Sequence, residues 1–106
     1  MTIKWIEKKK RNADVTIKHG ISKEKSRVYI TFRNDVWKKI TATGYIKVGI
    51  DGNRAYFCQG LMKSDFKITI KGDCNNGYVS LHTDLLDGFD GDYKLERDYN
   101  LRFIRK

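Results

Sequence analysis

Short runs rich in β-branched and aromatic residues recur along the chain, and turn-forming residues separate them. Such runs are typical of β-strands, because branched and aromatic side chains pack well on a pleated sheet. Asp51-Gly52-Asn53 favours a tight hairpin, and Asn75-Asn76-Gly77 favours a second turn. The predicted strands cover residues 15–18, 28–32, 45–50, 55–58, 66–71, 78–81, 93–95 and 101–104. The pattern therefore predicts a mainly β domain.

Two segments have the spacing of a short amphipathic helix. Asn34 is placed to cap a helix over residues 35–40, and Thr83 to cap one over residues 84–89. In both, apolar residues fall at i, i+1 and i+4, which lie on one face of a helix. Each capping residue is followed by an Asp, which favours the positive end of a helix dipole. The expected fold class is therefore α+β, mainly β with two short helices.

The same order of elements occurs twice. Residues 15–18 match residues 68–71 at an offset of 53, and residues 29–32 match residues 78–81 at an offset of 49. The helices continue at the second offset, and the hairpin positions that follow match at an offset of 47. Short deletions in loops account for the decreasing offset. The shared order of strand, cap, helix, glycine and hairpin favours an internal duplication, with similar strand composition as the alternative explanation.

One such unit is too small to bury the faces of its own sheet. Two units packed about a pseudo-two-fold axis would close a barrel and remove exposed strand edges. We therefore predict a single domain over residues 1–106 that forms a single-chain pseudo-two-fold barrel from two β-β-α-β-β repeats. The repeats cover residues 13–59 and 65–105, and residues 1–12 form a basic N-terminal arm.

Charge is distributed unevenly over the chain. The 106 residues carry a formal net charge of +9. Residues 1–53 hold 13 Lys or Arg against 5 Asp or Glu, whereas residues 54–106 hold 9 against 8. A basic half attracts polyanions such as nucleic acid, an acidic protein or an anionic membrane surface. Solubility alone is the alternative explanation of the excess.

The sequence also bears on the cellular compartment. No apolar run approaches the roughly 18 residues that cross a bilayer. Residues 1–6, Met-Thr-Ile-Lys-Trp-Ile, precede the charged residues 7–11, the wrong order for a signal peptide. We therefore expect a cytoplasmic protein without a membrane partner, with Cys58 and Cys74 as reduced thiols. A disulfide between them would require the strands to bring them together.

The order of strand, short amphipathic helix, glycine and hairpin resembles the swapped-hairpin DNA-binding domains of AbrB, MazE and SpoVT type. The resemblance lies in residues 28–40 with 44–48, and in residues 78–89 with 91–95. Gly91-Asp92 is similar to the family's usual Gly-Asp entry to the hairpin. The family's proline after the first strand is absent. The resemblance implies a barrel that the family builds as a homodimer, here formed within one chain, and a duplex DNA partner.

The resemblance also implies which basic residues contact DNA. Arg27 and Arg33 are the candidates for reading guanine edges, because arginine donates two parallel hydrogen bonds. The lysines displace counterions from phosphates, although Lys38 and Lys39 also fit a solvated helix face. The N-terminal arm fits either a backbone contact or a solvated tail. The complete set is Arg27, Arg33, Lys38, Lys39, Lys23, Lys25, Lys8, Lys9, Lys10 and Arg11.

The equivalent surface of the second half is acidic and should repel phosphate. It contains Asp84, Asp87, Asp90 and Asp92. The two halves are therefore not expected to bind DNA symmetrically. The acidic half then supports the basic one, contacts a protein partner, or pairs head-to-tail with the basic half of another copy. The expected state is a monomer or a weak homo-oligomer.

Catalytic chemistry has little support in the sequence. His19 and His82, the two histidines, lie outside any ligand pattern, and no nucleophile elbow, Walker loop or zinc motif is present. The carboxylates over residues 87–92 lack the EF-hand form. We therefore predict no enzyme activity, no metal and no cofactor.

Three functions remain open at this point. The first is a small basic DNA-binding regulatory protein, for which a phage or mobile-element origin fits a short, basic, proline-free chain. The second is a protein-interaction module or small inhibitor that acts through its polarised charge. The third is a single-strand nucleic-acid-binding β barrel, in which exposed aromatic rings stack on bases. The rings considered for that role are Trp5, Tyr45, Tyr56 and Phe57.

Overall fold

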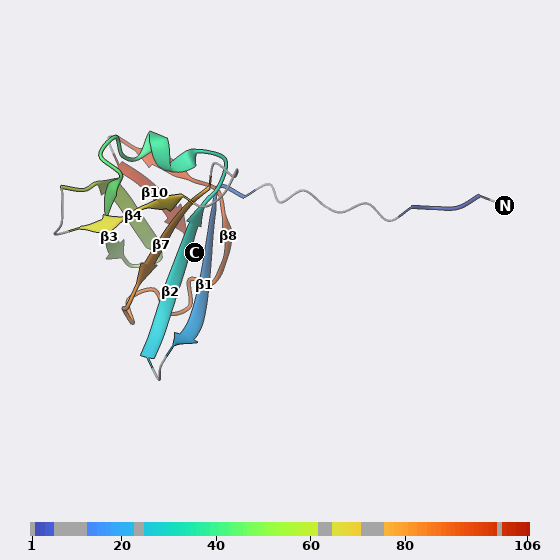
Figure 1. Cartoon of the computed structure of the whole chain (residues 1–106), viewed down its shortest axis with the longest axis horizontal. Coiled ribbons are helices and arrows are strands. Elements are labelled where there is room, and N and C mark those ends of the chain that lie inside the picture. Colours follow the sequence, from blue (N-terminus) through green and yellow to red (C-terminus); the bar gives the residue numbers. More distant parts are fainter. Residues whose placement is uncertain (1, 6–12, 23–24, 62–64, 71–75, 100) are drawn as a thin grey trace.

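The computed structural model shows two five-stranded antiparallel sheets, so the prediction of a mainly β fold is confirmed (Figure 1). It describes residues 2–5, 13–22, 25–61, 65–70, 76–99 and 101–106. Sheet A has the order β6-β7-β2-β1-β8, and its strands are Thr69–Ile70, Gly77–Leu81, Lys25–Phe32, Val15–Ser22 and Gly91–Tyr93. Sheet B has the order β5-β3-β4-β10-β9, and its strands are Phe66–Lys67, Tyr45–Asp51, Arg54–Gln59, Leu101–Arg105 and Glu96–Asp98.

The two sheets enclose one hydrophobic core. In β3, β4 and β7 the buried residues alternate with more exposed ones, as the two-residue period of a strand requires. Phe32 of sheet A and Phe57 of sheet B meet edge to face, with ring centroids 5.2 Å apart. Both rings are fully buried. The largest fully buried side chains of the core also include Phe89, Ile17, Ile30, Ile46, Leu86, Ile104, Val15 and Val28. Burial of this apolar surface is the main stabilising contribution.

The prediction of two short helices is not confirmed, because the first segment forms one short 3₁₀ helix and the second forms a turn. Residues 35–40 contain only a four-residue 3₁₀ helix, η1 (Val36–Lys39). Asn34 and Asp35 adopt left-handed backbone angles, with φ of 52° and 63°, so the chain does not enter an α-helix smoothly. The Asn34 N–H donates to Asn76 Oδ1 at 3.0 Å. A six-residue segment is also too short to offset the cost of nucleating an α-helix by itself.

Residues 84–87 form a turn and not a helix. The Leu85 N–H donates to Thr83 Oγ1 at 3.1 Å, so the expected capping side chain is used. Gly88 then adopts a φ of 82°, which ends any helical path. The capping signal was real, but in this sequence it stabilises a turn.

Helix η1 crosses one end of the molecule and packs on β7 (Figure 1). A Cβ atom at Gly77 would lie 2.6 Å from Ile68 Cγ2 and 2.8 Å from Trp37 Cδ1. Only a glycine fits this close approach without displacing its neighbours. Gly77 therefore fixes the position of Trp37 over the start of β7.

The predicted closed barrel is not confirmed, because the hydrogen bonds form two separate sheets. Two bent segments nevertheless pass from one sheet to the other. Residues 66–70 contribute β5 to sheet B and β6 to sheet A, with buried Ile68 between them. Residues 91–98 contribute β8 to sheet A and β9 to sheet B. The edge strands of sheet A, β6 and β8, are therefore each continuous in the chain with an edge strand of sheet B, β5 and β9 respectively.

The central pairings of the two sheets relate positions of the first half to positions of the second. Ile30 pairs with Val79 between β2 and β7, and these residues are 49 apart. Tyr56 pairs with Phe103 between β4 and β10, and these residues are 47 apart. Both separations equal the offsets found in the sequence. Strands of equivalent position therefore lie side by side at the centre of each sheet.

The edge pairings follow the same relation with one change of register. Thr16 pairs with Asp92 in sheet A, and Lys67 pairs with Tyr45 in sheet B. Tyr45 and Asp92 are 47 residues apart and therefore occupy equivalent positions in the two halves. Their pairing partners, Lys67 and Thr16, are 51 residues apart, whereas the sequence comparison gave an offset of 53 for this strand. The pairing thus relates Ile17 to Ile68. A pseudo-two-fold arrangement of two copies would give these pairings, and the duplication itself stays a prediction.

Candidate nucleic-acid interface

Outward-facing cations lie on β1 and β2 of sheet A and on the bent β5–β6 segment, which joins the two sheets. None of the residues of β1, β2, β7 and the β5–β6 segment that the structure assigns to these strands is Asp or Glu. Lys18, Arg27 and Lys67 lie among them on alternate, outward positions, and Lys18 and Lys67 are exposed. We call this outer surface of β1, β2, β7 and β5–β6 the cationic face. A surface of this kind favours polyanions.

Arg27 lies on β2, one position before the residues that pair with β7. It is opposite His82, and its Nη2 is 3.2 Å from the His82 Nε2 atom. The Arg27 Nε atom is buried without a hydrogen-bond partner. The rest of the side chain is partly exposed. The guanidinium is therefore held by one neighbour and keeps donors for an acceptor outside the protein.

Tyr29 leans across the sheet toward β1. A Cβ atom at Gly20 would lie 3.0 Å from Tyr29 Cε2, so the ring occupies the space that another side chain would need. The ring remains 41% exposed, an uncommon state for a tyrosine near the centre of a sheet. Tyr29 pairs directly with Ser80 of β7. Because its ring leans away from β7, it leaves the space above Ser80 open.

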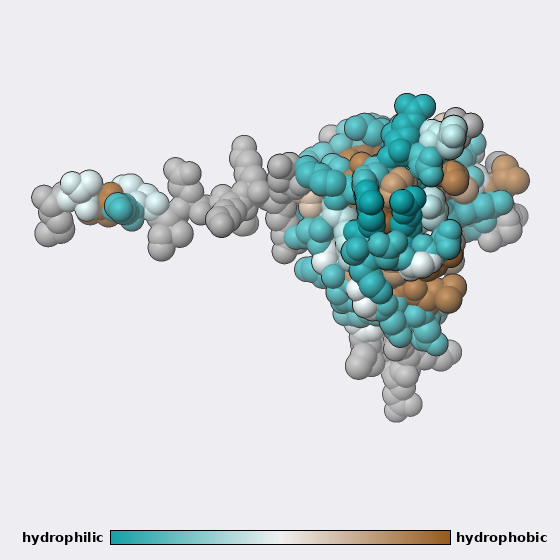
Figure 2. Space-filling view, turned by 180° about the vertical axis from the view of Figure 1, so that it is seen from behind, coloured by the Kyte–Doolittle hydropathy of each residue, from teal (hydrophilic) through white to brown (hydrophobic). Residues whose placement is uncertain are grey.

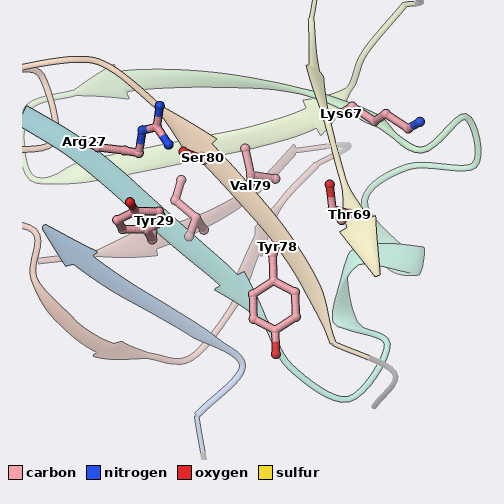
Figure 3. A pocket seen from close by; sticks show the side chains of 8 residues that line it. Arg27, Tyr29, Lys67, Thr69, Tyr78, Val79 and Ser80 are labelled. Carbon is pink, nitrogen blue, oxygen red and sulfur yellow. The ribbon is translucent and has the colours of Figure 1, made fainter. Parts of the chain in front are cut away.

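A cavity of about 400 Å³ lies above Ser80. Figure 3 shows Arg27 and Tyr29 on one side of β7 and Lys67 with Thr69 on the other. Tyr78, near the start of β7, also lines the cavity, together with the apolar side chains of Ile30 and Val79. The cavity therefore combines cationic, aromatic and hydroxyl groups on one open surface.

The predicted DNA contacts of the first half do not form one patch. Arg33 lies six residues after Arg27, about 20 Å along the strand direction. Its Nε donates to Thr16 Oγ1 at 3.0 Å, and that hydroxyl donates to Asp92 Oδ1 at 2.7 Å. Arg33 is thus engaged within the protein. Of the predicted arginines, Arg27 alone borders the cavity.

The two lysines of η1 lie near Arg33 in the chain and not near the cavity lining. Lys38 approaches Asp35 at 3.5 Å and lies over the Trp37 ring at 5.6 Å. Lys39 is exposed. Lys25 begins β2, and its side chain lies outside the described part of the chain. Lys8, Lys9, Lys10, Arg11 and Lys23 also lie outside the described residues.

Most of the predicted acidic surface is engaged with β1. Both ring nitrogens of His19 approach carboxylates, Nε2 at 3.4 Å from Asp87 Oδ1 and Nδ1 close to Asp90 Oδ1, without hydrogen-bond geometry. The His19 backbone N–H donates to Asp90 Oδ2 at 3.1 Å. Asp92 accepts from Thr16, and Asp84 is exposed. These carboxylates therefore hold the 84–90 loop against the edge of sheet A. A protein partner for them stays a prediction.

Tyr93 also fixes this loop. Its hydroxyl donates to the Phe89 carbonyl at 2.5 Å. Burial raises the pKa of the Tyr93 phenol, and the nearby Asp90 carboxylate raises it further. The phenol is therefore kept in the protonated form that this hydrogen bond requires.

The aromatic rings considered for base stacking differ from one another in burial, from fully buried to almost fully exposed. Phe57 is fully buried in the core, so this assignment is wrong. Tyr56 lies beside Phe103 with ring centroids 5.5 Å apart, and its hydroxyl accepts from Arg54 at 3.4 Å. That hydrogen bond is the main cause of the raised pKa of Arg54. Trp5 is 82% exposed, on a segment outside both sheets.

The structure also bears on the predictions for the cysteines and for the membrane. Cys58 is a free, partly exposed thiol, and Cys74 lies outside the described residues. No helix in the described part of the chain is long and apolar enough to cross a membrane. Seen from behind in Figure 2, hydrophilic residues cover most of the surface, and hydrophobic residues form small separate groups. Scattered exposure of this kind is usual for a protein surface.

Comparison of the chain with known protein families, with curated proteins and with solved structures found no match. The resemblance to AbrB-type domains therefore stays a prediction.

Proposed function

We propose that this protein is a small nucleic-acid-binding protein of the DNA-binding regulatory type, and that the cationic face is its interface. The observation that carries the proposal is the placement of Lys18, Arg27 and Lys67 on β1, β2 and β5, three strands whose described residues include no carboxylate. Phosphate contacts supply most of the affinity in such complexes, because each displaces condensed counterions. Arg27, which is partly exposed and borders the cavity, can supply one of these contacts.

The opposite surface of the molecule fits nucleic acid less well. On the outer side of sheet B, Arg105 forms an ion pair with Glu96 at 2.5 Å. Arg54 lies over the Phe103 ring at 4.8 Å and donates to Tyr56. Cations that already have partners within the protein gain less from a phosphate. The difference between the two faces supports an interface on sheet A.

The proposal is tested by measuring the affinity for a duplex and for a single strand over a series of salt concentrations. We expect duplex binding with a log K that falls steeply with log salt, by about 0.9 for each phosphate contact. Three contacts from the cationic face give a slope near −2.7 on that scale. Preference for the single strand would favour the β-barrel alternative. No binding to either form at low salt would contradict the proposal and leave the protein-interaction module.

A further inference from the structure

We propose that the cavity above Ser80 holds one unpaired nucleotide of a bound nucleic acid, with its base against Tyr29 and its phosphate near Arg27. The inference rests on the proposed function and adds a class of substrate to it. It predicts that the protein prefers a duplex with an extruded or bulged nucleotide over a fully paired duplex of the same length.

The chemistry of the lining matches the parts of a nucleotide. An aromatic ring offers a stacking surface to any base, because every base has a π-face. Arg27 supplies positive charge for a phosphate on one side of β7, and Lys67 lines the cavity on the other side (Figure 3). Ser80 and Thr69 supply hydroxyl groups that donate and accept hydrogen bonds. An apolar ligand would leave these cations and hydroxyls without acceptors.

The position of the tyrosines suits a planar ligand. Tyr29 pairs with Ser80 and Tyr78 pairs with Thr31, so the two tyrosines are diagonal neighbours on adjacent strands. Diagonal neighbours on one face lie about 7–8 Å apart, within reach of aromatic side chains. The small Ser80 side chain leaves the space beside them open. The resulting volume, about 400 Å³, is in the range of small-ligand sites.

The base bound in the cavity must be unpaired, because of the way bases stack in a duplex. Paired bases are stacked within the helix, and only their edges reach a groove. The face of a base becomes available when the nucleotide is extruded, at a cost that is lowest when it is already unpaired. A cavity bordered by an exposed ring therefore adds binding energy to an unpaired nucleotide and not to a paired one.

The test measures fluorescence anisotropy with two labelled duplexes of equal length, one fully paired and one with a single-nucleotide bulge. We expect the bulged duplex to bind about five-fold more tightly or better, the effect of one stacked base. Tyr29→Leu should abolish this advantage, measured as the ratio of the affinities for the bulged and the paired duplex. Tyr29→Phe, which keeps the ring, should retain it. Tyr99→Leu is the matched control, because Tyr99 is 89% exposed on another part of the surface.

The possible outcomes separate this inference from the proposed function. Equal binding of both duplexes by the wild type would overturn the inference and leave the cationic face as a duplex interface. Loss of the bulge preference in Tyr99→Leu as well would also overturn it, since the effect would not depend on the cavity. Displacement of the bulged duplex by AMP at equal nucleotide concentration would assign the cavity to free nucleotides. Absence of binding to either duplex would contradict both proposals.

Discussion

Replacing Phe57 with alanine is expected to lower the free energy of unfolding by about 3–5 kcal/mol. Phe57 is fully buried and meets Phe32 of the other sheet edge to face. The substitution removes apolar contact and leaves a cavity between the sheets that the surrounding strands fill only partly. Small domains are stable by about 5–15 kcal/mol, so the variant should lose a large fraction of its stability.

Urea unfolding followed by circular dichroism measures this loss, and Tyr99→Ala provides the control. The Tyr99 side chain is 89% exposed, and its truncation should change stability by no more than about 0.5 kcal/mol. A loss of less than about 1 kcal/mol for Phe57→Ala would contradict a core shared by both sheets. The same result would restore Phe57 as a ring available for base stacking.

The second large effect concerns the cationic face. Reversing the charge of Lys18 and Arg27 together, with Lys18→Glu and Arg27→Glu, should weaken duplex binding by about ten-fold or more at moderate salt. Two phosphate contacts are lost, and two carboxylates then repel the backbone. The slope of log K against log salt should also become shallower, by about 1.8 for two contacts. Both side chains point outward, so the fold should survive.

A matched control carries the same change in net charge on another part of the surface. Lys47 of β3 and Lys94, which follows β8, are both exposed and lie outside the cationic face. The Lys47→Glu, Lys94→Glu variant should bind the duplex several-fold more tightly than the Lys18→Glu, Arg27→Glu variant. Equal losses in both variants would show that net charge, and not its location, determines binding.

The sequence predicted the strands well because their signal is local. The run Val28-Tyr29-Ile30-Thr31-Phe32 lies within β2, and the Asp51-Gly52-Asn53 turn joins β3 to β4. The prediction of two α-helices failed because a six-residue segment with one apolar face fits an amphipathic helix and a turn equally well. In the structure, left-handed angles at Asn34 and Asp35 decide between these alternatives.

The candidate site was only partly predictable. Arg27 was found because it is a basic residue next to a strand. Tyr78 was missed because only the pairing of β7 with β2 places it beside Tyr29, and Lys67 was missed because only the pairing of β5 with β3 fixes its position. Alternation along 27–31 did indicate that Tyr29 points away from the core, so this ring could have been proposed. The contact of His19 with Asp90 had no sequence signal, because the residues are 71 positions apart.

The measurement that tests the central claim most directly is an NMR titration of the isotope-labelled protein with a short DNA duplex. Binding through the cationic face predicts that amide signals of β1, β2 and β7 shift together with duplex concentration, while those of β4 and β10 at the centre of sheet B remain in place. Shifts concentrated on β4 and β10, or a spectrum that does not change with added duplex, would contradict the account.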